Sequence, residues 1–165
     1  MFINLQKSWN NPFTNLPDRA ISYSQTMKKN EISILGSGLI GSLLSIYMKK
    51  RGLDVNVYEK RPDNRKGQYQ EEGRSINMAL SHRGWKSLEQ VGLKDKVLPL
   101  AIPMYGRKIH DEHGKTSFIP YGKEGQAIYS ISRGRFNQLL VDEAEKLGVN
   151  MFFGHKVDDV DLRTN

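Results

Sequence analysis

Segments with the apolar pattern of a β-strand alternate along this chain with segments that have the apolar spacing of an α-helix. Residues 31–35, EISIL, form a short apolar run before a glycine turn, which predicts a buried strand. Residues 39–50 have the spacing of a helix whose apolar face carries Ile40, Leu43, Leu44, Tyr47 and Met48. Residues 54–60, DVNVYEK, predict a second strand. A strand, a helix and a strand in about thirty residues are typical of a βαβ unit with parallel strands.

The later segments continue this alternation. Ser81 precedes a predicted helix at 82–91. Residues 105–122 predict a β-hairpin around a His-Gly turn, and residues 149–157 predict a further strand. Ser132 precedes another predicted helix, whose apolar side carries Phe136, Leu139, Leu140, Ala144 and Leu147. The stretch 73–84, GRSINMALSHRG, is too polar for a core strand, so its first part is expected to be a connector.

The first residues differ in composition from the rest. Residues 1–26 are rich in Asn, Ser, Thr and Pro and show no hydrophobic period. They also lack the basic start and the continuous apolar region of a signal peptide. They predict a disordered or non-native leader, and the domain itself is expected to span residues 27–165.

The bulk composition narrows the classes of protein. Apolar residues make up 38% of the 165 residues and charged residues 26%, which is typical of a globular domain. The chain has no cysteine, which excludes disulfides, a thiol nucleophile and cysteine metal sites. Because no run of 18 apolar residues is present, no transmembrane helix is expected.

The positive charge is concentrated in one part of the chain. The formal net charge is +7, and residues 28–66 hold nine Lys and Arg against four Asp and Glu, a local excess of +5. Solvated helix ends and loops explain most such clusters. Attraction for a phosphate-rich cofactor is a second explanation. Nucleic acid is a third, but no basic strand with interleaved aromatic residues supports it, so no nucleic-acid partner is expected.

A glycine pattern between the first strand and the first helix indicates a binding site. Gly36, Gly38 and Gly41 form GxGxxG, and Glu59 ends the second strand 18 residues after Gly41. Gly36 permits a tight turn, Gly38 lets backbone N–H groups approach a pyrophosphate at the helix N-terminus, and Gly41 lets helix and strand pack closely. Glu59 can accept both hydroxyl groups of an adenosine ribose, and its charge repels a 2′-phosphate. The pattern predicts bound FAD or NAD and leaves the choice between them open.

No side chain is a candidate for catalysis or for metal binding. The histidines fit no metal-ligand spacing and no Ser-His-Asp order; they are His82, His110, His113 and His155. Surface or packing roles are therefore expected for them.

Several segments resemble the kynurenine 3-monooxygenases, a family of flavin-dependent aromatic hydroxylases of tryptophan degradation. The matching stretches are VYEKR at 57–61, GRSINMALSHRG at 73–84, IPMYGRKIHDEHGK at 102–115, IPYG at 119–122 and YSISRGRFNQLLVDEAEK at 129–146. The resemblance implies an α/β fold, namely a truncated Rossmann-like FAD-binding domain of the flavin monooxygenase type. It also implies that a hairpin at about 105–121 begins the substrate-domain sheet.

The resemblance implies the residues of the site as well. Besides the three glycines, it implies further FAD contacts at Ile40, Tyr58, Glu59, Lys60, Arg61, Ala79, Arg133 and Val157. It carries substrate contacts onto Arg107 and Tyr121. The hairpin supports this pair: if the loop is 112–114, residue 107 opposes 119, and Tyr121 lies diagonally beside Arg107 on the same face. An arginine and a phenol placed in this way can hold a carboxylate.

The implied activity is the hydroxylation of L-kynurenine to 3-hydroxykynurenine, towards quinolinate and NAD synthesis. FAD carries the chemistry, NADPH is a transient reductant, and O2 is the co-substrate. Family members are much longer than this chain, so an incomplete enzyme that binds FAD weakly is expected. A bacterial-type cytoplasmic location is expected, and no membrane segment is expected in this chain. Because eukaryotic members of the family carry a membrane anchor in their C-terminal helices, anchoring by such a later segment stays open as an alternative. Three other interpretations stay open: another flavin hydroxylase acting on a phenol or hydroxybenzoate, an NAD-dependent dehydrogenase fragment, and a basic binding module.

Overall fold

The computed structural model describes residues 2–6, 30–63, 65–66 and 77–161, and only the backbone of residues 2–6. The chain divides into two compact units. One unit comprises Met1–Gln70 with Leu140–Asn165, and the other comprises Glu71–Leu139.

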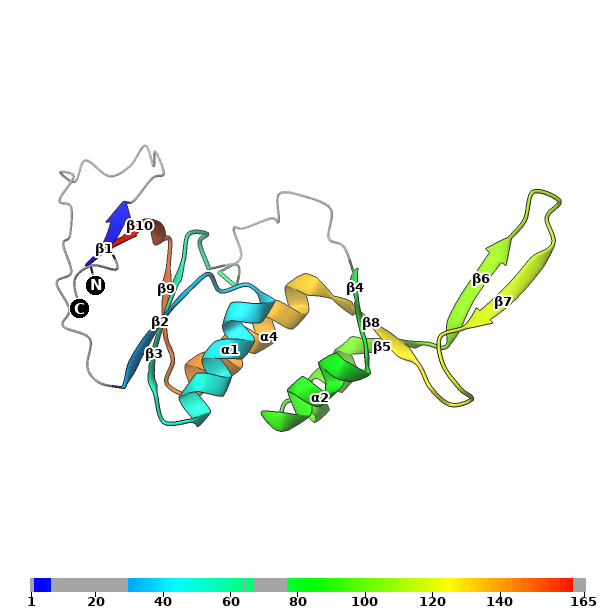
Figure 1. The fold of residues 1–165 in the computed structure, drawn as a ribbon, viewed down its shortest axis with the longest axis horizontal. Helices are drawn as coiled ribbons and strands as arrows, with labels where there is room; N and C mark the ends of the chain where they lie inside the picture. The colour runs from blue at the N-terminus through cyan, green and yellow to red at the C-terminus, as the bar shows by residue number, and fades with distance from the viewer. Residues whose placement is uncertain (1, 7–29, 64, 67–76, 162–165) are drawn as a thin grey trace. The chain divides into compact units, whose positions relative to one another are not determined.

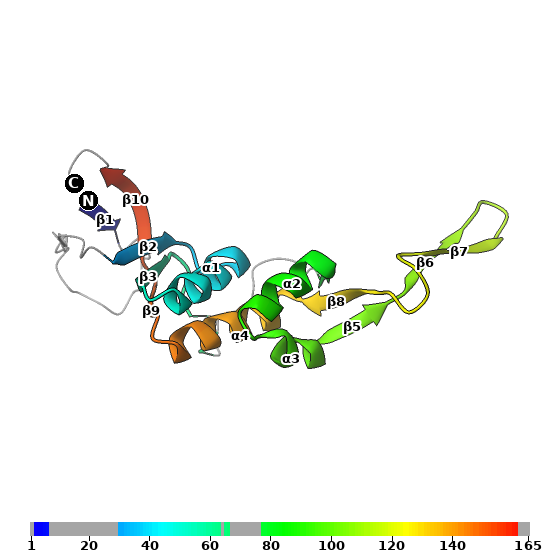
Figure 2. The same ribbon diagram turned by 60° about the horizontal axis from the view of Figure 1, so that its bottom comes forward.

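The first unit is built on a three-stranded parallel sheet. Its strands, in the order β2-β3-β9, are β2 (Glu31–Leu35), β3 (Asp54–Glu59) and β9 (Asn150–Phe153). Helix α1 (Leu39–Lys50) joins β2 to β3, so the predicted βαβ unit is confirmed. Figures 1 and 2 show α1 and helix α4 (Arg133–Lys146) on the same side of this sheet.

Helix α1 buries a different face from the one that its apolar residues predict. Its buried side chains are Ser42, Ser45 and Ile46, whereas Ile40 is 84% exposed. The hydroxyl of Ser42 donates to the carbonyl of Ser37 at 2.9 Å, so this polar group is satisfied although it is buried. The predicted apolar face was wrong because the helix packs on the sheet through the face that carries the small side chains of Ser42 and Ser45. Small side chains allow a close approach, so this face is buried in place of the apolar one.

A pair of antiparallel strands belongs to the same unit. β1 (Phe2–Gln6) pairs with β10 (Lys156–Asp161). The sequence predicted no element in residues 1–26, and it predicted one strand at 149–157 where the structure turns at Gly154 with φ +71°. Both expectations were wrong, because a strand depends on a distant partner and a glycine in the left-handed region breaks an extended run. The rest of the predicted leader lies outside the described residues.

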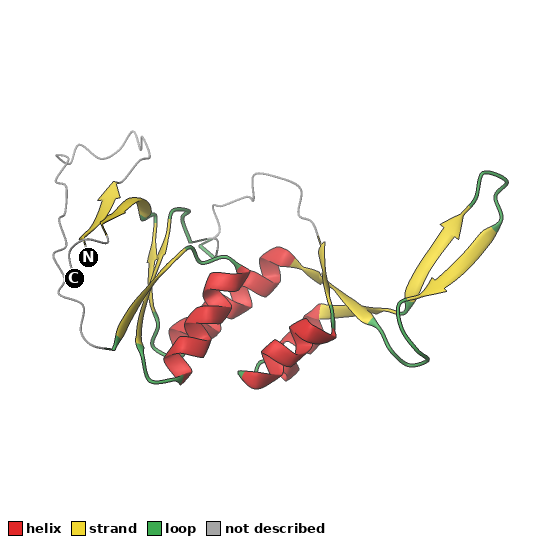
Figure 3. Ribbon diagram, viewed as in Figure 1, coloured by secondary structure: helices red, strands yellow, loops and turns green. Residues whose placement is uncertain are grey.

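The second unit packs helices against an antiparallel sheet. The strands, in the order β4-β8-β5, are β4 (Asn77–Leu80), β8 (Ile128–Ser132) and β5 (Ala101–Met104). The helical segments that follow β4 (Figure 3) are α2 (His82–Gln90), α3 (Lys94–Val97) and the 3₁₀ turn η1 (Leu98–Leu100). The buried side chains include Leu80, Trp85, Leu88, Val97 and Ile131. The indole of Trp85 meets the ring of Tyr129 edge-on, with centroids 5.1 Å apart.

Strand β4 corrects the expectation of a connector in GRSINMALSHRG. Its residues, NMAL, pair with β8, with Ala79 opposite Ser130, although the stretch around them is polar. Pairing partners fifty residues along the chain supply the hydrogen bonds that the local pattern does not reveal. Ser81 occupies the N-cap of α2 as predicted, without a side-chain hydrogen bond. Residues 73–76 of this stretch lie outside the described residues.

Helix α4 begins after Ser132 as predicted. The backbone N–H of Arg135 lies 3.5 Å from the hydroxyl of Ser132, and Gly148 follows the helix with φ +84°. Phe136, Leu140 and Ala144 of the predicted apolar side are buried, and Leu147 is 40% exposed. Within the described ranges no helix has both the length and the apolar character that crossing a membrane requires.

The predicted hairpin is confirmed, with the predicted register. Strand β6 (Gly106–His110) pairs with β7 (Thr116–Pro120), and residue 107 lies opposite residue 119. The turn is fixed by Gly114, with φ +78°, and by Asp111, whose Oδ1 accepts the N–H groups of residues 113 and 115 at 3.0 and 2.8 Å.

Candidate cofactor-binding site

The three glycines of the loop after β2 differ in their backbone conformation and in the space around them. Gly36 has φ +99°, and its N–H donates to the carbonyl of Tyr58 at 2.7 Å. A Cβ on Gly41 would lie 1.9 Å from the carbonyl oxygen of Gly36. Gly38, with φ −66° and ψ −177°, has a backbone that any residue adopts, and a Cβ there would meet nothing within 4 Å. Backbone conformation therefore explains Gly36 and packing explains Gly41, whereas neither explains Gly38, where the space beside the helix N-terminus is open.

The N-terminus of α1 opens onto the same loop. Its N-cap, Gly38, provides no side-chain hydrogen bond, and the first turn of the helix has no acidic residue. Ile40 in that turn is 84% exposed, which is unusual for a large apolar side chain. The backbone N–H groups of this turn and the helix dipole suit an anion such as a pyrophosphate.

Glu59 stands at the end of β3 and is tied to the loop. Its Oε2 accepts the backbone N–H of Ser37 at 2.8 Å and the hydroxyl of Ser37 at 3.2 Å. Its Oε1 accepts the backbone N–H and Nε of Arg61, both at 2.9 Å. Burial alone raises the pKa of Glu59, but the hydrogen bonds from Arg61 and Ser37 outweigh it and lower the pKa to about 2. The carboxylate is therefore charged throughout the physiological range.

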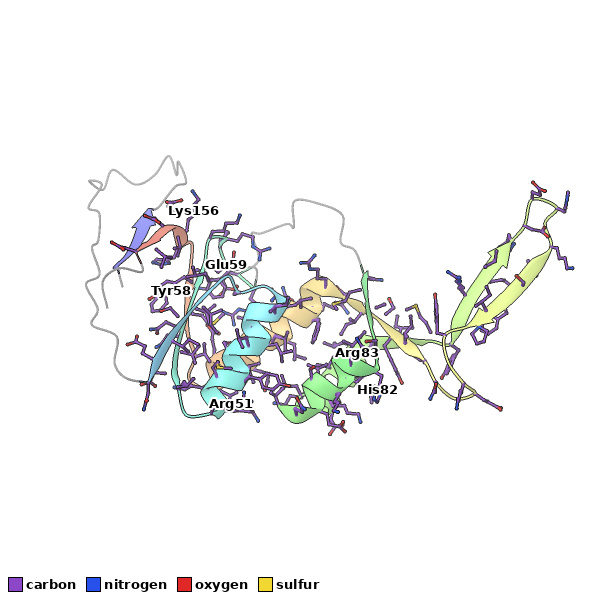
Figure 4. The ribbon with its side chains drawn as sticks, in the orientation of Figure 1. Arg51, Tyr58, Glu59, His82, Arg83 and Lys156 are labelled. Atoms are coloured by element: carbon purple, nitrogen blue, oxygen red, sulfur yellow. The ribbon has the colours of Figure 1, made fainter. Side chains whose placement is uncertain are left out.

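The geometry fits the ADP half of FAD. Figure 4 shows Tyr58 and Glu59 at the end of the sheet where Lys156 of β10 also lies. The Glu59 carboxylate is 6% exposed, and the Arg61 side chain that covers it is 51% exposed. Two ribose hydroxyls can replace the donors of Arg61 without unpacking the core, while Ser37 keeps its bond. The open space at Gly38 is where the pyrophosphate is expected, and this placement stays a prediction.

The other predicted FAD contacts of the first unit lie on the chain around Glu59 and on strand β10. Lys60 and Arg61 are exposed, and Val157 of β10 is half-buried. The N–H of Gly154 donates to the carbonyl of Arg61 at 3.0 Å, so the turn between β9 and β10 holds the chain after Glu59. The ring of Tyr58 stacks on that of Phe152 with centroids 5.0 Å apart. Direct contact of these side chains with FAD stays a prediction.

Ala79 and Arg133 belong to the second unit. Ala79 is exposed on β4 beside the small side chain of Ser130, which leaves that face of the sheet shallow. Arg133 is exposed as the first residue of α4, where the helix dipole disfavours a cation. Both positions are open to a ligand, and their contact with the flavin stays a prediction.

The predicted substrate pair lies on the hairpin. Arg107 opposes Ile119, and the N–H of Tyr121 donates to the carbonyl of Tyr105 at 2.9 Å. The alternation of side chains therefore puts Arg107 and Tyr121 on one face, diagonally placed, as the sequence predicted. Both side chains are exposed, which leaves them free to meet a ligand. Their role as a carboxylate clamp stays a prediction.

Sequence reasoning missed two parts of this site. Ser37 is the variable residue inside GxG, yet it is 3% exposed and donates twice to Glu59. Arg65 follows the predicted contact segment and forms ion pairs with Asp63 and with Asp142 and Glu145 of α4. The position of Ser37 between two motif glycines was a weak sequence signal for its role. No local signal indicated the pairs of Arg65 with α4, because Asp142 and Glu145 are 77 and 80 residues away in the sequence.

The charge of Glu59 gives a pH-dependent prediction. Its pKa of about 2 lies below the ordinary value of 4.5, so its stabilising contribution is complete above about pH 5 and is lost as the pH falls towards 2. That contribution is at most about 3 kcal/mol. Urea unfolding between pH 7 and pH 3 should show a smaller loss of stability on acidification for Glu59→Gln than for the original chain. Glu89→Gln, at an exposed pair with Lys94, is the control. Parallel curves for the original chain and Glu59→Gln would contradict the prediction.

The chain is similar in sequence to named proteins. A profile of the family described as FAD binding domain matches residues 29–162. The kynurenine 3-monooxygenase of Cytophaga hutchinsonii is 52% identical over 133 residues, which cover 79% of this chain and 29% of that enzyme. Proteins of the same name from Christiangramia forsetii and Caenorhabditis elegans are 46% identical, over 82% and 79% of this chain and 30% and 28% of theirs. This chain therefore spans about 30% of the length of the curated relatives it matches.

Solved structures share the fold. A 2-methyl-3-hydroxypyridine-5-carboxylic acid oxygenase matches with a TM-score of 0.63 at 24% identity, over 78% of this chain and 32% of that chain. The p-nitrophenol 4-monooxygenase of Pseudomonas putida matches with a TM-score of 0.65 at 18% identity, over 80% of this chain and 34% of that chain. Likeness at these identities concerns the fold.

Proposed function

Because this chain belongs to the family of FAD-binding domains, of the type found in flavin monooxygenases, we propose that it forms the ADP-binding part of a kynurenine 3-monooxygenase. The observation that carries the proposal is the open space beside Gly38, in a loop that Ser37 links to the carboxylate of Glu59. The identities of 43–52% to curated relatives of that name favour kynurenine over other substrates.

The proposed reaction hydroxylates L-kynurenine to 3-hydroxykynurenine with NADPH and O2. The bound flavin supplies the redox chemistry. This chain supplies position: the N-terminus of α1 holds the pyrophosphate, and Glu59 holds the ribose. The proposal includes a cytoplasmic location and no nucleic-acid partner.

We place the substrate carboxylate at the hairpin. Arg107 offers a planar fork of donors, and the phenol of Tyr121 lies diagonally beside it. The register of the hairpin supports this pairing, because it puts both side chains on one face. An amino-acid substrate has the carboxylate that such a pair recognises.

A chimeric enzyme tests the proposed substrate. Residues 29–162 replace the matched segment of the Cytophaga hutchinsonii enzyme, so that the remaining length is supplied by a relative. L-kynurenine is expected to stimulate NADPH oxidation and to yield 3-hydroxykynurenine. Stimulation by 4-hydroxybenzoate alone would favour the phenol-hydroxylating alternative. Protection of this chain from unfolding by NAD, and not by FAD, would favour the dehydrogenase alternative.

Arg107→Ala in this chimera is expected to raise KM for L-kynurenine ten- to a hundredfold, since a charge-assisted hydrogen bond contributes about 1.5–3 kcal/mol. FAD affinity should not change. Lys108→Ala is the matched control, because Lys108 follows Arg107 on β6 and points to the opposite face of the hairpin. Equal effects of the two substitutions on KM would reject the clamp. Steady-state kinetics with flavin content as a second readout give the answer.

A further inference from the structure

We propose that Arg65 is a positioning residue of the FAD site. It fastens the segment that carries Lys60 and Arg61 to helix α4, and so fixes the side of the site where the adenosine binds. This inference rests on the proposed FAD site and deepens it, because it assigns a role to a residue that does not itself face the glycine loop.

Three carboxylates surround the guanidinium of Arg65. Nε and Nη2 donate to the two oxygens of Asp63 at 2.8 and 2.7 Å, which makes a bidentate pair. Nη1 donates to Asp142 at 2.8 Å and to Glu145 at 2.5 Å, both on α4. One side chain therefore joins the chain after β3 to a helix 77 residues further along.

The cluster is partly shielded from water. The Arg65 side chain is 21% exposed and that of Asp63 is 6% exposed. The guanidinium also lies over the ring of Phe153, 5.4 Å from its centroid. Ion pairs that are partly buried and bidentate are screened less by salt than exposed single pairs, so this cluster holds its geometry better than most surface pairs.

The cluster lies beside the binding residues and shares a support with them. Phe153, which Arg65 covers, precedes Gly154, whose N–H donates to the carbonyl of Arg61 at 3.0 Å. The N–H of His155 donates to the carbonyl of Glu59 at 2.8 Å. The chain from Glu59 to Arg65 is therefore held by β9 and its turn on one side and by α4 on the other. Loss of the α4 tie would let the backbone of residues 60–61 move away from the end of β3 where the ribose is proposed to bind, whereas the Arg61 side chain itself gives way to the ribose in either case.

The chemistry of the cluster requires arginine. A guanidinium presents donors in a plane and can meet Asp63 in a fork while its remaining nitrogen reaches Asp142 and Glu145. A lysine ammonium keeps the charge but has no fork. Arg65→Lys is therefore expected to behave like Arg65→Met in ligand affinity, which a purely electrostatic role of the charge would not produce.

The test uses this chain with FAD and with ADP. In Arg65→Met and Arg65→Lys, the dissociation constants for both ligands, measured by calorimetry at a temperature where the variants are folded, should rise at least tenfold. ADP is included because the cluster acts on the adenosine side. Lys94→Met is the matched control: it removes an exposed ion pair with Glu89 in the other unit and should leave both affinities unchanged.

A second readout needs no ligand. The Nε–H of Arg61 bonds Glu59 in the free chain, so its hydrogen exchange, followed by NMR, should quicken in the Arg65 variants. If Arg65→Met does not fold, the double variant Asp142→Asn with Glu145→Gln removes only the α4 half of the cluster, at side chains that are 48% and 40% exposed. Unchanged exchange of Arg61 and unchanged ADP affinity in a folded variant overturn the inference. Failure of the original chain to bind FAD would count against the proposed function, whereas the exchange measurement would still decide the role of Arg65.

Discussion

A Gly38→Ala variant is expected to keep its fold and to lose FAD affinity by a factor of about 100, or about 3 kcal/mol. The backbone at Gly38 suits any residue, and an added Cβ would meet nothing of the chain within 4 Å. That open space is where the pyrophosphate must approach the N–H groups of α1, so a methyl group there displaces the ligand.

Two measurements on the same variant check this expectation. The free energy of unfolding, measured with urea, should change by no more than about 1 kcal/mol. Alanine is a poorer N-cap than glycine, but it also restricts the unfolded chain more, so the two effects oppose each other. Titration with FAD, followed by flavin fluorescence, should show the loss of affinity. A folded Gly38→Ala chain that binds FAD as tightly as the original chain would remove Gly38 from the site.

Gly41→Ala is expected to act in the opposite way, by destabilising the first unit. Its Cβ would lie 1.9 Å from the carbonyl oxygen of Gly36 and 3.4 Å from a methyl carbon of Ile34. Backbone atoms cannot give way as a flexible side chain can, so α1 must shift away from β2. Overpacking of this kind costs about 1–3 kcal/mol or more, which is a large part of the stability of a small domain.

Gly38 and Gly41 lie three residues apart, and their alanine variants should separate an effect on binding from an effect on folding. Gly41→Ala should lower the urea midpoint clearly, and it should lose FAD affinity only as a consequence of the shifted helix. Gly38→Ala should lose affinity with an unchanged midpoint. If Gly41→Ala unfolded at the same urea concentration as the original chain, the close contact between α1 and the loop would be disproved.

The parts of the site that could be predicted from the sequence are local. The glycine loop is recognised from the GxGxxG spacing, and Glu59 from its place at the end of the next strand. Both signals depend on backbone geometry over a short stretch of chain. The hairpin register followed in the same way, because a turn with Gly114 in the left-handed region fixes which residues oppose each other. The resemblance to a known family selected FAD where the βαβ pattern alone left FAD and NAD open.

The parts that could not be predicted depend on distant partners. Strand β4 is only four residues long, NMAL, within a polar stretch, and it pairs with β8 about fifty residues further along, so the local pattern did not reveal it. The buried face of α1 follows from the close approach that Ser42 and Gly41 permit, and hydrophobic spacing pointed to Ile40, which is exposed. Short-range patterns report the preferences of a segment, whereas burial reports what the rest of the chain puts against it.

The sequence by itself determined that a GxGxxG loop, a carboxylate at the end of the second strand and a hairpin with Arg107 would be present. Only the tertiary structure decided that Ser37 and Arg61 hold the carboxylate of Glu59 with a lowered pKa, and that Arg65 ties the neighbouring segment to α4. The physical reason is that glycine geometry and strand alternation act between near neighbours. The ion pairs of Arg65 join residues 77 and 80 positions apart, and folding alone brings such residues within hydrogen-bond distance.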